Sequence, residues 1–327
     1  MNSFHYERAQ DAAAAVQAIS AHSKFLAGGT NLIDLMKNGV EKPEHLIDIN
    51  RLALATIDPQ PDGGLRLGAL ARNSDTANHP LVRQRYPLLS QAILSGASPQ
   101  LRNLATNGGN LLQRTRCPYF MDIGFAQCNK RAPGTGCGAI DGFNRTHAMF
   151  GASERCIAVH PSDMCVALAA LDAVIRVQGR NGLRTMAIAD FHRLPGTTPE
   201  IDTNLQPDEL ILSIDLPATP YAAHSHYLKI RDRASYEFAL VSVAAALELE
   251  GNTIRSARIA LGGVAHKPWR AEAAERSLVG QKATPQLFEA AGRDAVAGAK
   301  PYRENQFKVE MAKRAVTRAL SVAGGIA

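Results

Sequence analysis

A long stretch without a regular hydrophobic pattern constrains this 327-residue chain more than any other feature. Residues 97–165 are rich in glycine, proline, asparagine and cysteine, and they contain all five cysteines of the chain. A segment of this length without secondary structure is uncommon inside a compact domain, unless something other than apolar packing holds it in place. Cysteines that bind a metal could do so, because metal binding supplies folding energy.

Four of the cysteines, Cys117, Cys128, Cys137 and Cys156, are separated by ten, eight and eighteen residues. Disulfides suit small oxidised domains that lack a core, which does not describe a chain of this size. Structural zinc sites usually pair their ligands at C-x2-4-C, far closer than here. A [4Fe–4S] cluster also takes four thiolates, and a long loop can bring them together from irregular spacings. On spacing alone, a cluster, a zinc ion and structural cysteines all stay open.

The surroundings of the cysteines divide them into two kinds. Cys165 lies in the apolar run SDMCVALAALDA, where we expect it to act as a small buried hydrophobic residue. The other four have basic neighbours that would offset the negative charge of a thiolate cluster: Arg114, Arg116, Lys130 and Arg131. His147 and His160 lie near the same loop, and we expect hydrogen bonding from both rather than metal ligation.

Composition indicates a folded protein that does not enter a membrane. Apolar residues make up 46% and charged residues 20%, which allows a large core and excludes a disordered chain. The net charge of +6 arises from 36 Lys and Arg against 30 Asp and Glu, dispersed along the chain, so we expect a solvated surface and no nucleic-acid binding. No apolar run approaches the roughly 20 residues of a membrane span. Glu7, Arg8 and Asp11 interrupt the apolar stretch that a signal peptide needs, so we expect no export signal here.

Apolar runs and turn residues predict an α+β chain with two domains, 1–216 and 217–327, and a cysteine-rich insertion at about 114–160 in the first. We expect strands at 4–6, 24–28, 45–49, 64–70, 173–177 and 209–217, and a long pair, 239–250 and 253–264. We expect helices after Asp11, from Thr30 to Gly39, from Ser74, and over 87–96, 269–280 and 305–323. The prolines and small residues of 216–227 predict a linker.

Two glycine loops are candidates for binding phosphate groups. The loop LAGGTNL, residues 26–32, lies between an expected strand and helix, and RNLATNGGNLLQ, residues 102–113, repeats its chemistry. Glycines let backbone N–H groups approach a ligand, and a following helix start favours an anion. Four side chains could add donors: Thr30, Asn31, Thr106 and Asn110. Two such loops suit a dinucleotide pyrophosphate, although neither is a Rossmann or Walker sequence.

Several segments resemble the FAD-binding medium subunits of xanthine dehydrogenase-type molybdenum hydroxylases. They are FLAGGTNLIDLMK, LRNLATNGGNLLQ, HPSDMCVALAALDA and YLKIRDRASYEFALVSVAAAL, and the likeness extends from Phe4 to the last helix. The insertion RTRCPYF…CNK…GCGAIDGF…ERCIAVHPSD resembles the subgroup that carries an added [4Fe–4S] cluster, which includes the FAD subunits of periplasmic aldehyde oxidoreductases. The fold implied is a vanillyl-alcohol-oxidase-type (PCMH) FAD-binding domain, followed by a smaller α+β domain of the CO dehydrogenase flavoprotein C-terminal type.

The resemblance also implies a role for each candidate residue. The first loop would wrap the FAD pyrophosphate with Leu26, Ala27, Gly28, Gly29, Thr30, Asn31, Leu32, Ile33 and Asp34. The second FAD loop would consist of Thr106, Gly108, Gly109 and Asn110. Asp163 would contact the adenosine half, and Lys229 would approach the flavin. The cluster would be bound by Cys117, Cys128, Cys137 and Cys156.

The family's chemistry implies an electron-transfer role. A large molybdopterin-binding subunit would oxidise the aldehyde, a small subunit would carry two [2Fe–2S] clusters, and this chain would pass electrons through FAD to an acceptor. No Ser-His-Asp arrangement, carboxylate pair or H-E-x-x-H motif suggests a catalytic residue in it. We expect export to the periplasm in folded form with a signal-bearing partner, or otherwise a cytoplasmic location. Alternatives are a stand-alone flavin oxidoreductase and a zinc-stabilised binding module.

Overall fold

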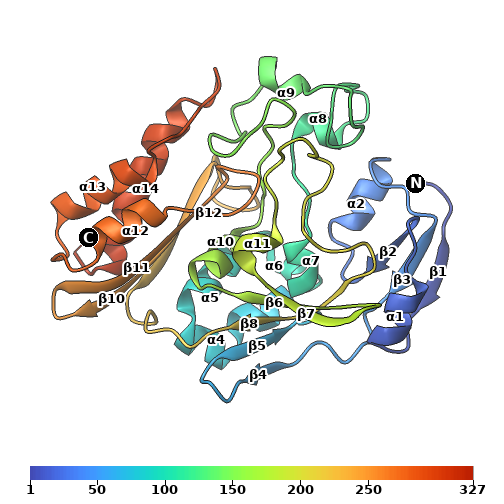
Figure 1. Cartoon of the computed structure of the whole chain (residues 1–327), viewed down its shortest axis with the longest axis horizontal. Helices are drawn as coiled ribbons and strands as arrows, with labels where there is room; N and C mark the ends of the chain where they lie inside the picture. Colours follow the sequence, from blue (N-terminus) through green and yellow to red (C-terminus); the bar gives the residue numbers. More distant parts are fainter. Residues whose placement is uncertain (327) are drawn as a thin grey trace.

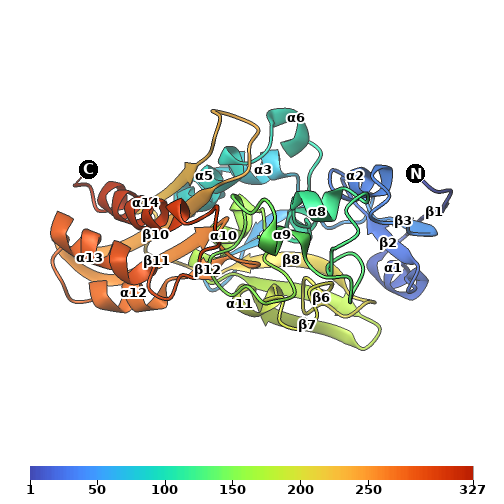
Figure 2. The same cartoon turned by 90° about the horizontal axis from the view of Figure 1, so that it is seen from above.

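The computed structural model describes residues 1–326, which form three sheets in a row with helices packed between and around them (Figure 1, Figure 2). The N-terminal sheet lies at one end of the molecule and the C-terminal sheet with its helices at the other, in both views. Among the described residues, no helix has both the length and the apolar character that crossing a bilayer requires. The mixture of parallel and antiparallel sheets with separate helices agrees with the predicted α+β class.

The first sheet is parallel, with strand order β1-β3-β2. Its strands are β1 (His5–Arg8), β2 (Ser23–Leu26) and β3 (His45–Asp48), and its helices are α1 (Ala12–Ala18) and α2 (Leu32–Lys37). The side chain of Asp11 accepts a hydrogen bond from the Ala14 N–H at 2.7 Å, so it caps α1 as predicted. Gly39 follows α2 with φ +71°, a conformation that favours glycine and ends the helix.

The second sheet has five antiparallel strands in the order β4-β5-β8-β6-β7. They are β4 (Ile57–Pro59), β5 (Leu65–Gly68), β6 (Val174–Gly179), β7 (Gly182–Ala187) and β8 (Leu210–Leu216). Helices associated with this region are α3 (Asn73–Asn78), α4 (Pro80–Arg85), α5 (Pro87–Ser95), α10 (Asp163–Ala170) and α11 (Ile188–Phe191). Every residue of α10 is buried, which explains why its sequence is apolar on all sides.

The third sheet has the order β12-β11-β10-β9 and carries three helices. The strands are β9 (Ser225–Ile230), β10 (Val241–Glu250), β11 (Thr253–Gly262) and β12 (Trp269–Arg270), and the helices are α12 (Glu272–Leu278), α13 (Pro285–Ala295) and α14 (Phe307–Ala323). Val243 and Ala245 of β10 belong to the core beneath these helices, whereas Ala244 and Ala246 belong to the core that contains α10. The strand is buried on both faces, so its sequence is continuously apolar.

The cysteine-rich stretch is mostly loop, as predicted. It contains only short helices: α6 (Pro99–Arg102), α7 (Asn107–Leu111), α8 (Pro118–Met121) and α9 (Gly138–Asp141). Figures 1 and 2 show α8 and α9 between the first and third sheets. A small apolar cluster of Leu35, Phe120 and Cys128 joins this stretch to α2.

The sequence missed several elements, among them β4, β7, α11 and α13, and it placed β12 inside an expected helix. Strand β7 is largely exposed and lacks an apolar face, and helix α13 follows a run of polar residues. The expected linker 216–227 is shorter than predicted because β9 begins at Ser225. The expected boundary between domains follows the end of β8, and the division into two domains stays a prediction.

The start of α14 holds the loop that follows α9. The Asn305 side chain donates to the carbonyls of His147 and Ala148 at 3.1 and 3.2 Å. Lys308, which is fully buried, donates to the carbonyls of His147, at 2.8 Å, and Gly263. Burial lowers the pKa of this lysine to about 7. Its contacts are carbonyl oxygens from separate segments, so one amine joins the third sheet to the cysteine-rich stretch.

We predict that Lys308→Met lowers the free energy of unfolding by about 2 kcal/mol, because buried carbonyls lose their partner. Chemical denaturation of the cofactor-loaded chain measures this. Lys313→Met is the control, since Lys313 lies on the same helix but is partly exposed and pairs with Glu310. It should change the free energy by no more than about 0.5 kcal/mol. A Lys308→Met protein as stable as wild type would contradict the assigned role.

Candidate functional site

The two predicted glycine loops meet in the structure. A Cβ atom on Gly28 would lie 2.1 Å from the Leu104 carbonyl oxygen, so only glycine allows the two segments to touch. Gly29 has φ +71°, which also favours glycine. In the second loop, the Gly108 N–H donates to the Ala69 carbonyl at 2.8 Å, and the Thr106 hydroxyl accepts from the Gly109 N–H at 3.2 Å. The absence of a Cβ at Gly28 thus lets the loops touch, and the two hydrogen bonds hold the second loop in its conformation.

A cleft of about 500 Å³ opens beside the loops, next to a second cavity of about 250 Å³. Thr30, Asn31 and Gly109 line both, so the two spaces form one elongated site that passes the glycine loops. Of the predicted FAD-binding residues, all but Ile33 line one space or the other: Leu26, Ala27, Gly28, Gly29, Thr30, Asn31, Leu32, Thr106, Gly108 and Gly109 in the cleft, and Asp34, Asn110, Asp163 and Lys229 in the second cavity.

The side-chain amides in this site differ in how free they are. Asn110 donates to the Asn73 side chain at 2.7 Å and accepts from the Ser162 hydroxyl at 2.6 Å, so it is already engaged. The Asn31 Oδ1 accepts from the Arg114 backbone N–H at 2.9 Å, while its Nδ2 is buried without a partner. An unpaired buried donor costs free energy unless a ligand accepts its hydrogen bond. Asn31 thus has a free donor at the point where the two spaces join.

Asp163 and Lys229 lie together at the far end of the site. The Lys229 Nζ is 2.8 Å from the Asp163 Oδ2, and the Tyr227 hydroxyl donates to the other carboxylate oxygen at 2.7 Å. Burial raises the pKa of Tyr227 well above its usual value, so it stays a neutral donor. Because the two charges are paired and buried, they face the same part of the site. Their predicted contacts with different halves of FAD stay predictions.

The four predicted ligand cysteines line one small cavity of about 10 Å³. Cys128 and Cys137 lie opposite each other in an isolated antiparallel bridge, Cys117 precedes α8, and Cys156 closes a turn with Ser153. All four are free thiols. Cys165, by contrast, is fully buried in the core of α10, as predicted.

Backbone N–H groups face three of the four sulfurs. Those of Tyr119 and Phe120 face Cys117, those of Ala139, Ile140 and Ile157 face Cys137, and that of Ala158 faces Cys156. Burial nevertheless raises the pKa of Cys117 to about 12 and that of Cys156 to about 11. These thiols need a bound cation to become thiolates, and the amides are in position to stabilise the sulfur charge once they do.

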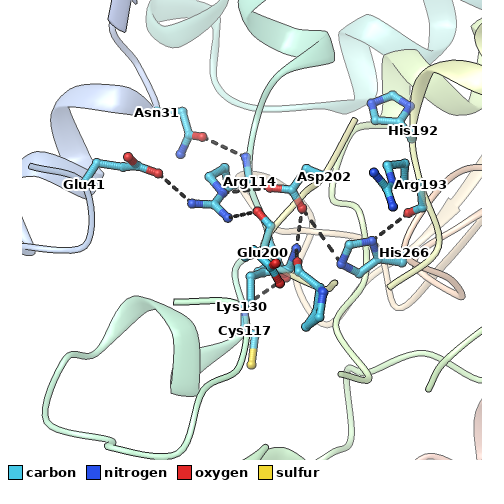
Figure 3. A network of polar contacts seen from close by, with 12 residues as sticks. Asn31, Glu41, Arg114, Cys117, Lys130, His192, Arg193, Glu200, Asp202 and His266 are labelled. Atoms are coloured by element: carbon cyan, nitrogen blue, oxygen red, sulfur yellow. Dashed lines mark hydrogen bonds and ion pairs between the residues drawn. The ribbon is translucent and has the colours of Figure 1, made fainter. Parts of the chain in front are cut away.

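The basic neighbours of the cysteines do not all face the sulfurs, contrary to expectation. Arg131 donates to the carbonyls of Tyr119 and Phe120, and Arg116 lies over the Phe238 ring. Arg114 binds Glu41 and Asp202 (Figure 3). Only Lys130 of the four lines the cysteine cavity. The other three basic residues, all arginines, hold the surrounding loops in place.

Histidines contribute more than the sequence predicted. His147 behaves as expected, with its Nε2 3.1 Å from the Cys117 sulfur. His160 and His192 line the cleft with their rings 4.2 Å apart, and each has one buried nitrogen without a partner. His192 lies in the segment after α11, far from any motif, so no sequence signal points to it.

Comparison with known proteins identifies both halves of the chain. The family described as FAD binding domain in molybdopterin dehydrogenase matches residues 2–219. The CO dehydrogenase flavoprotein C-terminal domain matches residues 226–323. Both agree with the fold implied by the sequence.

Relatives align over most or all of the chain. The aldehyde oxidoreductase FAD-binding subunit PaoB of Escherichia coli is 52% identical over 99% of each chain. The glyceraldehyde dehydrogenase medium chain of Sulfolobus acidocaldarius is 30% identical over 88% of this chain and 84% of its own length.

Solved structures show the same fold. The carbon monoxide dehydrogenase of Hydrogenophaga pseudoflava matches with a TM-score of 0.77 and 28% identity, over 99% of this chain and 98% of that one. The enzyme from Oligotropha carboxidovorans matches with a TM-score of 0.78 and 25% identity, over 100% of this chain and 99% of that one. The chain therefore belongs to the FAD-binding medium subunits of the molybdenum hydroxylase family, as an oxidoreductase subunit.

Proposed function

We propose that this chain is the FAD- and [4Fe–4S]-carrying electron-transfer subunit of a heterotrimeric molybdenum-dependent aldehyde oxidoreductase. The observation that carries the proposal is the full-length similarity to an aldehyde oxidoreductase subunit, in a chain where four cysteines line one cavity near the glycine-loop cleft. The chain accepts electrons from a [2Fe–2S] subunit and passes them to an external acceptor. The aldehyde is oxidised on a large molybdopterin-binding subunit.

The elongated site fits FAD. Backbone N–H groups of the first glycine loop and the unpaired Asn31 amide offer donors to the pyrophosphate, while Gly28, which lacks a Cβ, lets the second loop pack against the first. Asp163 and Lys229 bind at one end of the dinucleotide. Bound FAD supplies a group that takes up two electrons and releases them one or two at a time. The residues of this chain orient it and exclude water from it.

The spacing of the four cysteine sulfurs argues against a zinc ion. Four thiolates around zinc, at Zn–S distances of about 2.3 Å, lie roughly 3.8 Å from one another. Among the described residues, the groups whose metal-binding atoms come within 4.8 Å of one another include none of these four cysteines. The backbone amides that face the sulfurs support a cluster as well, because such hydrogen bonds tune its potential. These features favour an iron–sulfur cluster over the zinc-stabilised binding module.

The partners and the location follow from the family resemblance. A large molybdopterin-binding subunit and a small [2Fe–2S] subunit complete the heterotrimer. Export to the periplasm proceeds with the folded complex, on a signal carried by a partner. A stand-alone flavin oxidoreductase is the alternative, and it would turn over a small substrate without partners.

We predict that anaerobically purified chain contains one FAD and about four iron and four acid-labile sulfide per chain. An absorption spectrum with an iron and sulfide count measures this. A protein that contains zinc and no iron would contradict the cluster, and steady turnover of an aldehyde by the isolated chain would contradict the subunit role.

We predict that Cys128→Ser destabilises the chain more than it slows flavin reduction, because the cluster holds the long loop in place. Thermal unfolding and stopped-flow flavin reduction in the complex measure the two effects. Cys165→Ala is the control, since that cysteine lies outside the cavity and should leave the iron content unchanged. Normal folding and FAD content with lost turnover would show that the cluster carries electrons instead.

We predict that Gly28→Ala reduces bound FAD to less than about a tenth of the wild-type content, because its methyl group would overlap the Leu104 carbonyl and push the two loops apart. The FAD-to-protein ratio after gel filtration measures this. Gly124→Ala serves as the control, because a Cβ there would meet only the Asp122 side chain, at 3.0 Å. Full FAD content in Gly28→Ala would contradict the placement of FAD at these loops.

A further inference from the structure

Lys130 extends from the cysteine loop to a different segment of the chain. The turn after Cys128 is held by the Ala132 N–H, which donates to the Cys128 carbonyl at 2.8 Å. Within this turn, Asn129 accepts from the N–H groups of Gly134 and Gly136 at 3.0 and 2.9 Å. The next side chain, Lys130, is 1% exposed and donates to the Pro199 carbonyl at 2.7 Å and to the Asp202 carboxylate (Figure 3). The fold of the turn thus determines where this ammonium group lies.

Asp202 links Lys130 to residues that line the cleft. Its second oxygen accepts from the Arg114 Nε at 2.8 Å, and Arg114 also binds Glu41 at 2.6 Å (Figure 3). The backbone N–H of the same arginine donates to the Asn31 Oδ1, which leaves the Asn31 amide free to face a ligand. Four residues therefore connect the cysteine loop to the first glycine loop: Lys130, Asp202, Arg114 and Asn31.

The charge of Asp202 makes this four-residue connection depend on the position of Lys130, and so on the cysteine loop. Burial alone would raise the pKa of Asp202, but Lys130 and Arg114 together hold it well below its usual value, so it is a carboxylate. Without Lys130 in place, this carboxylate loses one of its two cations. A partly buried ion pair that loses one partner is strongly destabilised, so the segment would have to rearrange around Arg114.

We propose that Asp202 is a positioning residue through which the folded cysteine loop holds the FAD-binding loop in its binding conformation. FAD retention then depends on the cysteine loop, and the loop acts through Lys130. This inference rests on the proposed function, because it takes the cleft as the FAD site and the cysteine loop as the cluster site.

A substitution of Lys130 distinguishes this positioning role from a direct contact with FAD. Asp202, Arg114 and Asn31 all line the cleft, so a change in any of them could act on the ligand itself. Lys130 lines the cysteine cavity and not the cleft. An effect of Lys130 on FAD affinity must therefore pass through the groups that its ammonium contacts, the Pro199 carbonyl and the Asp202 carboxylate, and the double variant below isolates the part that passes through Asp202.

The test uses the full-length chain, stripped of FAD and titrated with FAD by flavin fluorescence, with iron counted in each preparation. We expect Lys130→Gln to raise the dissociation constant of FAD about tenfold, while its iron content stays at the wild-type level. Asp202→Asn should raise it at least as much, and Asp202→Glu should recover part of the loss. The double variant Lys130→Gln/Asp202→Asn should be no weaker than Asp202→Asn alone, since both changes break the same connection.

Asp215→Asn is the matched control. Asp215 has a similar exposure, 23% against 27% for Asp202, and also binds an arginine, with Arg66 at 2.8 Å. It lies on β8 and lines neither the cleft nor the cysteine cavity. FAD affinity in this variant should match that of wild type.

Two results would overturn the inference. One is an FAD dissociation constant within twofold of wild type in iron-loaded Lys130→Gln. The other is additive loss in the double variant, which would mean that the residues act separately. If Lys130→Gln loses iron or fails to fold, Lys130→Met, which keeps the length of the side chain and removes only the ammonium group, takes its place in the same titration and is judged by the same two results. Wild-type protein without iron and sulfide would instead contradict the proposed function.

Discussion

The structure depends on satisfying the backbone of a long loop that has little apolar surface of its own. A buried carbonyl or N–H without a partner costs as much as a lost hydrogen bond, so each one in the cysteine-rich stretch must find a donor or acceptor. Side chains supply them. Asn144 donates to the carbonyls of Ala139, Ile140 and Gly142. Asn305, just before α14, and Lys308, in its first turn, donate to carbonyls of the same stretch. In this stretch, polar side chains therefore supply the hydrogen bonds that neighbouring strands supply to the backbone in a sheet.

This arrangement determines how the two candidate sites relate to each other. Two neighbouring side chains of the cysteine loop extend in different directions. Arg131 binds a carbonyl within the loop, whereas Lys130 binds Asp202, on the side of the glycine loops. The cleft contributes Arg114 and Asn31 to the same network. The two sites share a buried set of charges, so a change in one loop reaches the other through ion pairs rather than through a helix or a strand.

The outer sheets show why parts of the fold could be predicted. Helix α1 has a capping aspartate, and β10 and β11 are long apolar strands with Gly251 at the turn, so local rules identify them. Strand β7 has no apolar face because it is exposed, whereas α13 buries one regular face that consists mostly of small residues (Ala291, Gly292 and Ala295), which an apolar pattern does not reveal. Burial of β10 on both faces follows from contact with α10 on one side and α14 on the other.

The sequence by itself determined the residue types of both sites: glycines where a Cβ would collide, and four cysteines separated from the one in the core. It also determined the family, through motifs that extend along the whole chain. Only the tertiary structure decided that Asp163 and Lys229 bind each other, that Asn110 is already engaged while Asn31 has a free donor, and that Lys130 reaches from the cysteine cavity to Asp202. Local sequence determines conformation within a few residues, whereas these side-chain pairings join positions 37 to 83 residues apart, and only packing brings them together.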